Sequence, residues 1–281
     1  MTRRVSEYRG VKRALRELPA HLFGIAVVFI CLGPILFVLN ASFKNIATYK
    51  DFAFSLSGWT VANYTDLLRT SGMPRWITNT VFVSFAITLL TVFIDLMAAF
   101  AFAKVKFRGR HVMFLILIST MMLPFSITLV PTYLLAVRFG LVDRYLGLIL
   151  PALSGPLGVY LLRQFIIAIP DALLESARID GASTFRIFRS IVAPLCYQPM
   201  AVLGILTFVN SWNSFLWPLL IAQSDEMKTL TVGIATTHLQ YAENLGGITA
   251  SAMLSLIPMV ILFFLFQRFF LQGVTAGAIK G

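Results

Sequence analysis

Long apolar runs alternate with short polar connections along the 281-residue chain. A helix needs about 20 apolar residues to cross a bilayer, and six runs reach that length. The pattern therefore predicts an all-α polytopic membrane protein with six transmembrane helices. The predicted spans are Leu22–Ser42, Ile77–Ala103, Val112–Val137, Tyr145–Ile167, Pro199–Ala222 and Ser251–Leu271. Pro124 and Pro131 are expected to interrupt the third of these spans.

Composition supports this reading of the chain. Hydrophobic residues make up 58% of it and charged residues only 12%, against about 25% charged in soluble domains. The net charge of +11 would suggest a nucleic-acid partner in a soluble protein. In a membrane protein, basic residues flank the cytoplasmic ends of helices instead. We therefore expect a lipid bilayer and no nucleic acid as the partner of these charges.

Lysine and arginine predict the orientation. With six spans, sixteen of these residues fall on one side and seven on the other. The richer side is expected to be cytoplasmic, which places both termini inside. The expected organisation is a cytoplasmic segment 1–21, a six-helix membrane domain 22–271 and a cytoplasmic tail 272–281.

One polar segment, "LLESARIDGASTFRIFRS" at 173–190, interrupts the apolar pattern on the cytoplasmic side. Pro170 suits a first helical turn, and the first of two short helices is expected to run to about Ile179. Gly181 favours a left-handed helix stop, and Ser183 can cap a second helix ending before Pro194. Residues 170–193 thus predict a helix–glycine–helix elbow. Two interpretations stay open: a partner outside the membrane grips it, or it lies on the lipid surface.

The second helix of this elbow carries an apolar stripe. Phe185, Phe188 and either Ile191 or Val192 recur at three- and four-residue spacing. The stripe could fill a cleft on a partner, or it could pack against the chain's own helix ends. The sequence does not separate these two roles.

The stretch "ESARIDGASTFRIFRSIVAPL" resembles the cytoplasmic signature of ABC importer permeases, which reads Glu-Ala-Ala, three residues, Gly, nine residues, Ile-x-Leu-Pro. Five positions match at the required spacing, and Ser176 and Ala193 replace an Ala and the Leu. The matching residues are Glu175, Ala177, Gly181, Ile191 and Pro194. "NSWNSFLWPLLI" at 210–221 and "GVTAGAIKG" at 273–281 are similar to the second permease of maltose-type, carbohydrate-importing systems.

The resemblance implies an ABC type I importer permease fold in a bacterial inner membrane. It makes the elbow a coupling helix that sits on a cytoplasmic ATP-hydrolysing subunit. The residues implied in that contact are Glu175, Ser176, Ala177, Asp180, Gly181, Phe185 and Phe188. The C-terminal tail, with Gly277 and Lys280, is implied to reach toward the interface of two ATPase subunits.

The resemblance also implies partners and a cargo. The partners are a second homologous permease, a dimer of ATP-binding subunits and an extracytoplasmic solute-binding protein. The chain lacks a Walker-type sequence, so ATP and Mg are expected on the partner and no cofactor on this chain. We thus expect a permease, not an enzyme, for a sugar or sugar-like solute; glycerol-3-phosphate or its diesters are the alternative.

Polar and aromatic residues of the fifth span are candidates for the solute path. Asn210, Asn213 and Trp217 recur at i, i+3 and i+7, which would place all three on one helix face. Amides and aromatic faces suit sugar binding. Alternatively, Trp212 and Trp217 are anchors at the membrane interface.

Asp95 is the one acid inside a predicted span. Intramembrane acids are costly and often functional, but proton coupling would need more of them. We expect a structural bond to a partner helix, with Arg163 as the candidate partner. A secondary transporter would carry several such groups, and a membrane enzyme would need a metal or catalytic cluster, for which the sequence shows no spacing.

Overall fold

The computed structural model of the protein describes residues 2–44, 57–153, 155–240 and 245–278, and all regular secondary structure in this part of the chain is helical. Three helices are long and apolar enough to cross a membrane by themselves. They cover Glu17–Ser42, Met73–Lys104 and Leu245–Gln267. Three bent helix pairs raise the number of candidate spans among the described residues to as many as six, the predicted number, if each pair counts as one span. The last of these pairs is Thr184–Leu195 with Tyr197–Trp212, so it begins earlier than the predicted span Pro199–Ala222.

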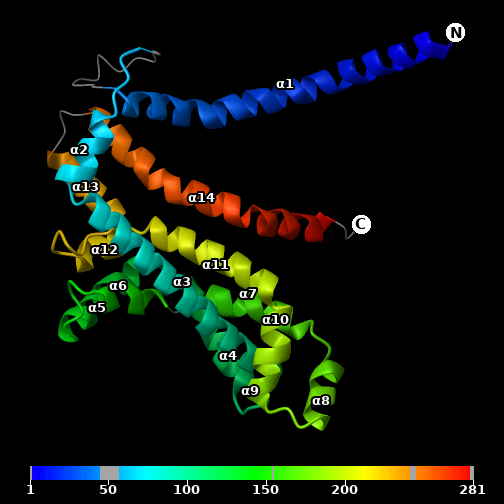
Figure 1. Ribbon diagram of the computed structural model, residues 1–281. Coiled ribbons are helices and arrows are strands. Elements are labelled where there is room, and N and C mark those ends of the chain that lie inside the picture. Colours follow the sequence, from blue (N-terminus) through cyan, green and yellow to red (C-terminus); the bar gives the residue numbers. More distant parts are fainter. Residues whose placement is uncertain (1, 45–56, 154, 241–244, 279–281) are drawn as a thin grey trace. The chain divides into compact units, whose positions relative to one another are not determined.

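The chain divides into two compact units (Figure 1). The first comprises residues 1–70 and 238–254 and contains α1 (Thr2–Ser42), α2 (Ala62–Thr70) and the beginning of α14 (Leu245–Ala278). Asn63 of α2 donates its amide hydrogens to the carbonyl oxygens of Ser42 at 2.9 Å and Lys44 at 2.8 Å. This amide therefore ties α2 to the end of the first span.

The second unit comprises residues 71–237 and 255–281. Its centre is the long helix α3 (Met73–Lys104), which packs against α7 (Pro156–Ile167) and α11 (Tyr197–Trp212). Apolar side chains from all three helices form one buried cluster, including Leu96, Leu162 and Leu203. Van der Waals packing of these side chains holds the three spans together.

Three predicted spans of this unit are broken. The third consists of α4 (Arg110–Ser119), η2 (Thr120–Met122) and α5 (Phe125–Arg138), with a bend of 102°. Pro124 stands directly before α5, so the interruption expected from that residue is confirmed. The interruption expected from Pro131 is wrong, because α5 continues through that residue. The fourth begins with α6 (Tyr145–Ile149) and η3 (Leu150–Ala152) before α7.

The fifth span divides into α11 and α12 (Leu216–Ile221). α11 ends at Trp212, and the backbone of Asn213 and of Phe215 leaves the helical geometry. The hydropathy pattern predicts a single helix from Pro199 to Ala222, and this prediction is therefore wrong.

Polar contacts join connections that the lysine and arginine count places on the same, less basic side. Asp143 accepts hydrogen bonds from the backbone N–H groups of Gln223 at 3.0 Å and Ser224 at 2.9 Å. These bonds, led by the one from Ser224, lower the pKa of the Asp143 carboxyl. Trp76, at the start of α3, donates its indole N–H to the carbonyl oxygen of Asp225 at 3.0 Å. Within the second unit, the loops predicted to share a side do meet.

The last helix extends into the predicted C-terminal tail. Helix α14 continues to Ala278, so the segment predicted to begin at residue 272 is largely part of a helix. Gly277 lies in the last turn of that helix. Lys280 lies outside the described residues.

Candidate functional site

The predicted elbow is present at one end of the second unit, opposite the end with α5, α6 and α12 (Figure 1). Its first arm, α8 (Asp171–Ile179), has the expected end and begins one residue after Pro170, which precedes the helix as its N-cap. Gly181 follows with a φ of +78°, the left-handed conformation that glycine adopts at low cost. The N–H of Gly181 donates to Arg178 O at 3.0 Å, and that of Ala182 donates to Ala177 O at 2.9 Å. This pair of bonds is a Schellman motif, which fixes the turn angle through the backbone.

The second arm begins with α9 (Thr184–Ile187), where the Ser183 hydroxyl accepts the N–H of Arg186 at 3.3 Å. The expected N-cap is therefore confirmed. The arm continues through a π-helical turn, η4 (Phe188–Val192), into α10 (Ala193–Leu195). The predicted end before Pro194 is wrong, because the proline follows a π turn in which the regular i→i−4 bonds are already interrupted. A bend of 75° then leads into α11.

Buried side chains anchor both arms of the elbow to the body of the second unit. Leu174 of α8 and Ile187 of α9 are almost fully buried in the cluster formed with α3 and α7. Phe188 is also buried, and its ring centroid lies 5.4 Å from that of Phe100 on α3. Since these side chains use the apolar side of the elbow within the chain, that side is not available to lie on a lipid surface.

Lys104, the last residue of α3, forms a further link that the sequence reading missed. Its ammonium group donates to the carbonyl oxygens of Ile167 at 3.3 Å and Ile169 at 2.6 Å, and it pairs with Asp171 at 2.7 Å. This hydrogen bond and charge lower the pKa of the Asp171 carboxyl. One side chain thus joins the end of α3, the end of α7 and the start of α8. A lysine ending one span and an acid opening a later helix were the only signal for it.

The outer side of the elbow is exposed and mixed in character. Ile179 is 87% exposed and Phe185 is 65% exposed, although both belong to a polar segment. Glu175, Ser176 and Asp180 are exposed as well, whereas Ala177 is half-buried. The apolar stripe therefore serves two purposes: Phe188 packs on the chain's own helix, and Phe185 faces outward.

The predicted path residues do not share one helix face. Asn210 is exposed near the end of α11, and Asn213 follows that helix and donates its amide to Val209 O at 2.9 Å. Trp217 lies in the separate helix α12, where it is buried and donates its indole N–H to Gly147 O at 3.0 Å. The prediction that they share one face is wrong because the span breaks between Trp212 and Leu216.

Asp95 lies on α3 and is 1% exposed. Its Oδ2 has no hydrogen-bond partner among the described residues and faces Gly155 and Gly158 of the broken fourth span. Arg163 does not pair with it: the Arg163 side chain donates to Phe102 O at 3.2 Å and lies 4.0 Å over the Phe114 ring. The expected Asp95–Arg163 bond is therefore wrong, and the close neighbour of the carboxyl is a glycine.

Metal chemistry has no support in the described residues. Among them, no group of three or more His, Cys, Asp or Glu side chains lies close enough to hold a metal ion.

The sequence matches a known protein family and is similar to several known proteins. Residues 75–276 match the family described as "Binding-protein-dependent transport system inner membrane component". The chain is 35% identical to the arabinooligosaccharides transport system permease protein AraQ of Halalkalibacterium halodurans, over 91% of this chain and 93% of that protein. It is 32% identical to the sn-glycerol-3-phosphate transport system permease protein UgpE of Rhizobium meliloti, over 94% of this chain and 97% of that protein.

Among solved structures, the chain is similar to one from a bacterial ABC transporter involved in the import of the acidic polysaccharide alginate. The TM-score is 0.79 at 23% identity, covering 92% of this chain and 98% of that one. A second alginate transporter structure, in complex with an alginate pentasaccharide-bound periplasmic protein, gives a TM-score of 0.62 at 20% identity, covering 92% and 94%. These likenesses establish a common fold.

Proposed function

Because the chain belongs to the family of binding-protein-dependent transport system inner membrane components, we propose that it forms half of the translocation path of an ATP-driven importer for a sugar or sugar-like solute. Two such permeases would enclose a cavity that opens alternately to either side of the inner membrane. Energy would come from a separate motor, and this chain would convert the movement of that motor into a change of access.

The exposed outer side of the elbow carries this proposal. Ile179 and Phe185 are large apolar side chains beyond the membrane spans, and leaving them in water is unfavourable. Glu175 and Asp180 lie beside them and add charge to the same surface. An apolar centre with a charged rim is typical of a protein–protein contact. The partner that fits is a cytoplasmic ATP-binding subunit, with ATP and Mg bound there.

The residues of the coupling contact divide by role. Glu175 would pair with a cation of the partner, and Phe185 would fill its cleft. Gly181 sets the angle between the arms, while Ala177 and Ser176 keep that face of α8 small. Phe188 acts from inside, because it holds the second arm on α3.

The remaining partners follow from the family and from the solutes that its sugar-transporting members carry. We propose a second homologous permease, a dimer of ATP-binding subunits and an extracytoplasmic solute-binding protein. Both termini would be cytoplasmic, with the elbow and the loop after α3 on that same side. Gly277 and Lys280 are proposed to approach the ATP-binding subunits.

The cargo proposal rests on relatives that transport arabinooligosaccharides or glycerol-3-phosphate. Asn210 and Asn213 stand exposed around the break between α11 and α12 and are proposed to line the path. Trp217, buried against Gly147 O, would support the shape of that break. A sugar is the first candidate, and glycerol-3-phosphate or a glycerophosphodiester is the second.

Reconstitution tests the proposal. The chain would be co-expressed with its neighbouring permease and ATP-binding subunit and placed in vesicles containing ATP. We expect ATP hydrolysis stimulated by the loaded binding protein, and uptake of a labelled arabinooligosaccharide in preference to glycerol-3-phosphate. The reverse preference supports the second cargo. Uptake by the purified chain alone, driven by an ion gradient, contradicts an ATP-driven importer and supports a secondary transporter.

A further inference from the structure

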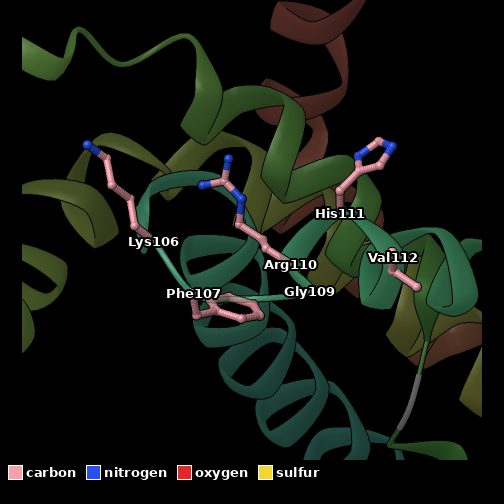
Figure 2. A pocket seen from close by; sticks show the side chains of 6 residues that line it. All are labelled: Lys106, Phe107, Gly109, Arg110, His111 and Val112. Atoms are coloured by element: carbon pink, nitrogen blue, oxygen red, sulfur yellow. The ribbon is translucent and has the colours of Figure 1, made fainter.

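An open hollow lies where the chain leaves α3 and enters α4 (Figure 2). Its lining residues belong to the connection between α3 and α4 and not to the outer side of the elbow. The lining residues are Lys106, Phe107, Gly109, Arg110, His111 and Val112. None of these six residues is acidic.

The basic side chains of the hollow point the same way. Figure 2 shows Lys106, Arg110 and His111 directed to one side of the loop, while the Phe107 ring turns to the other. Gly109 has a φ of +81° and starts α4, so the positive end of that helix dipole adds to their charge. Side chains and helix end together favour an anion.

The charges around the hollow do not neutralise its basic side chains, and its net charge stays positive. Arg110 donates to Val105 O at 3.2 Å, which orients its guanidinium but neutralises nothing. Its charge also repels that of Arg163, which lies over the Phe114 ring. The nearby acid Asp171 is paired with Lys104, and its charge also attracts that of Lys106, so it offsets only part of the positive charge of the hollow.

The hollow borders an exposed apolar surface. Val112 lines the hollow and begins a run of exposed residues along α4 that continues with Met113, Leu115 and Ile116. Because α4 belongs to a candidate membrane span, acyl chains cover this surface whether or not the hollow is occupied. A molecule with an anionic head and a hydrocarbon tail would cover both.

We propose that the hollow binds the phosphate of an anionic phospholipid headgroup, with one acyl chain along the exposed side of α4. Lys106, Arg110 and His111 would contact the phosphate, and Val112 and Met113 would contact the chain. Each basic residue near an anionic lipid surface contributes about 1 kcal/mol. The bound lipid would brace the connection between α3 and α4, beside the Lys104 link.

Lipid retention by the assembled importer tests this inference. The complex would be equilibrated in nanodiscs of phosphatidylethanolamine with increasing phosphatidylglycerol, released, and its bound lipids counted by native mass spectrometry. We expect one tightly retained phosphatidylglycerol at this chain. Lys106→Gln should weaken its apparent affinity about fivefold, and Lys106→Gln with Arg110→Gln about 30-fold.

A matched control is the double variant Arg138→Gln with Arg144→Gln, which removes two exposed basic residues from another connection and should keep the lipid. Equal retention in the Lys106/Arg110 variant and this control overturns the inference. Displacement of the lipid by millimolar inorganic phosphate shows a site for free anions and also overturns it. So does cross-linking of Met113→Cys to the second permease, since that surface would then be a subunit interface. These readouts do not depend on transport, so they stand apart from the test of function.

Discussion

Replacing Gly158 by alanine should force apart the helices that pack around the buried acid. A Cβ atom at this position would clash with Asp95 Oδ2, far inside the van der Waals contact distance, and would lie 2.9 Å from Asp95 Cγ and 3.0 Å from Leu203 Cδ2. Asp95 is 1% exposed, so its carboxyl cannot swing into open space. α3, α7 and α11 would therefore have to move apart.

The size of the effect follows from a comparison within the same bundle. Overpacking of this kind costs about 1–3 kcal/mol, and the change from glycine to alanine in a helix returns up to about 1 kcal/mol. Gly204 on α11 is the matched control, because a Cβ there would meet Thr88 and Val92 at ordinary distances of 3.6 and 3.7 Å. The difference between Gly158→Ala and Gly204→Ala isolates the clash, since both share the gain in helix propensity.

Thermal unfolding of the assembled importer, followed by size-exclusion chromatography after heating, measures this difference. In soluble chains of 150–250 residues, 1 kcal/mol shifts Tm by about 2–4 °C, so a drop of several degrees is expected for Gly158→Ala only. Asp95→Ala should restore much of the loss in the double variant, giving an interaction free energy of about 1–3 kcal/mol. If Gly158→Ala is as stable as Gly204→Ala, or if Asp95→Ala gives no rescue, the close packing described here is wrong.

Three further outcomes are expected. Gly181→Val should insert and assemble normally but lose coupling of ATP hydrolysis to uptake, because a β-branched residue is disfavoured at a φ of +78°; uptake at the wild-type rate would contradict this. Phe185→Ala should weaken binding of the ATP-binding subunit at unchanged Tm, whereas Phe188→Ala should cost about 3–5 kcal/mol of stability; equal effects on both measurements would reject the division of roles. The Asp143 carboxyl has a lowered pKa, so its contribution to stability is present above its unfolded pKa of about 3.9 and is lost as the pH falls through the folded value. Tm measured from pH 6 to 3 should therefore fall less steeply in Asp143→Asn than in the parent, and identical slopes would refute that contribution.

The hydropathy pattern predicted much of the fold because it reports a property of each segment alone. It predicts the six apolar runs, and from their number it predicts which connecting loops lie on the same side of the membrane. The breaks were harder to place: Pro124 interrupts the third span as expected, but Asn213 ends α11 without proline or glycine. Such an end depends on what the following residues contact, here the bond of Trp217 to Gly147 O.

The elbow was predictable because its geometry is local. Gly181 and Ser183 fix a turn and a cap through bonds to residues at most five positions away. Contacts distant in sequence were not predictable in the same way. Lys104 joins Asp171 across 67 positions, and Asp95 faces Gly158 instead of Arg163, since only the packed bundle decides which helix faces meet.

The link made by Lys104 fixes the elbow to α3, so that the long helix can act as a lever moved from the elbow. The ammonium group fixes the start of the elbow to the end of α3, while the Phe188–Phe100 contact fixes its second arm to the same helix. α3 has 32 residues, or about 48 Å at helical rise. If α3 pivots as a rigid body, a tilt of about 5° imposed at the elbow moves the opposite end by about 4 Å, more than the diameter of a water molecule. A small change of tilt at the elbow would thus become a larger displacement at the opposite end of α3, because no loop between the two ends absorbs the movement.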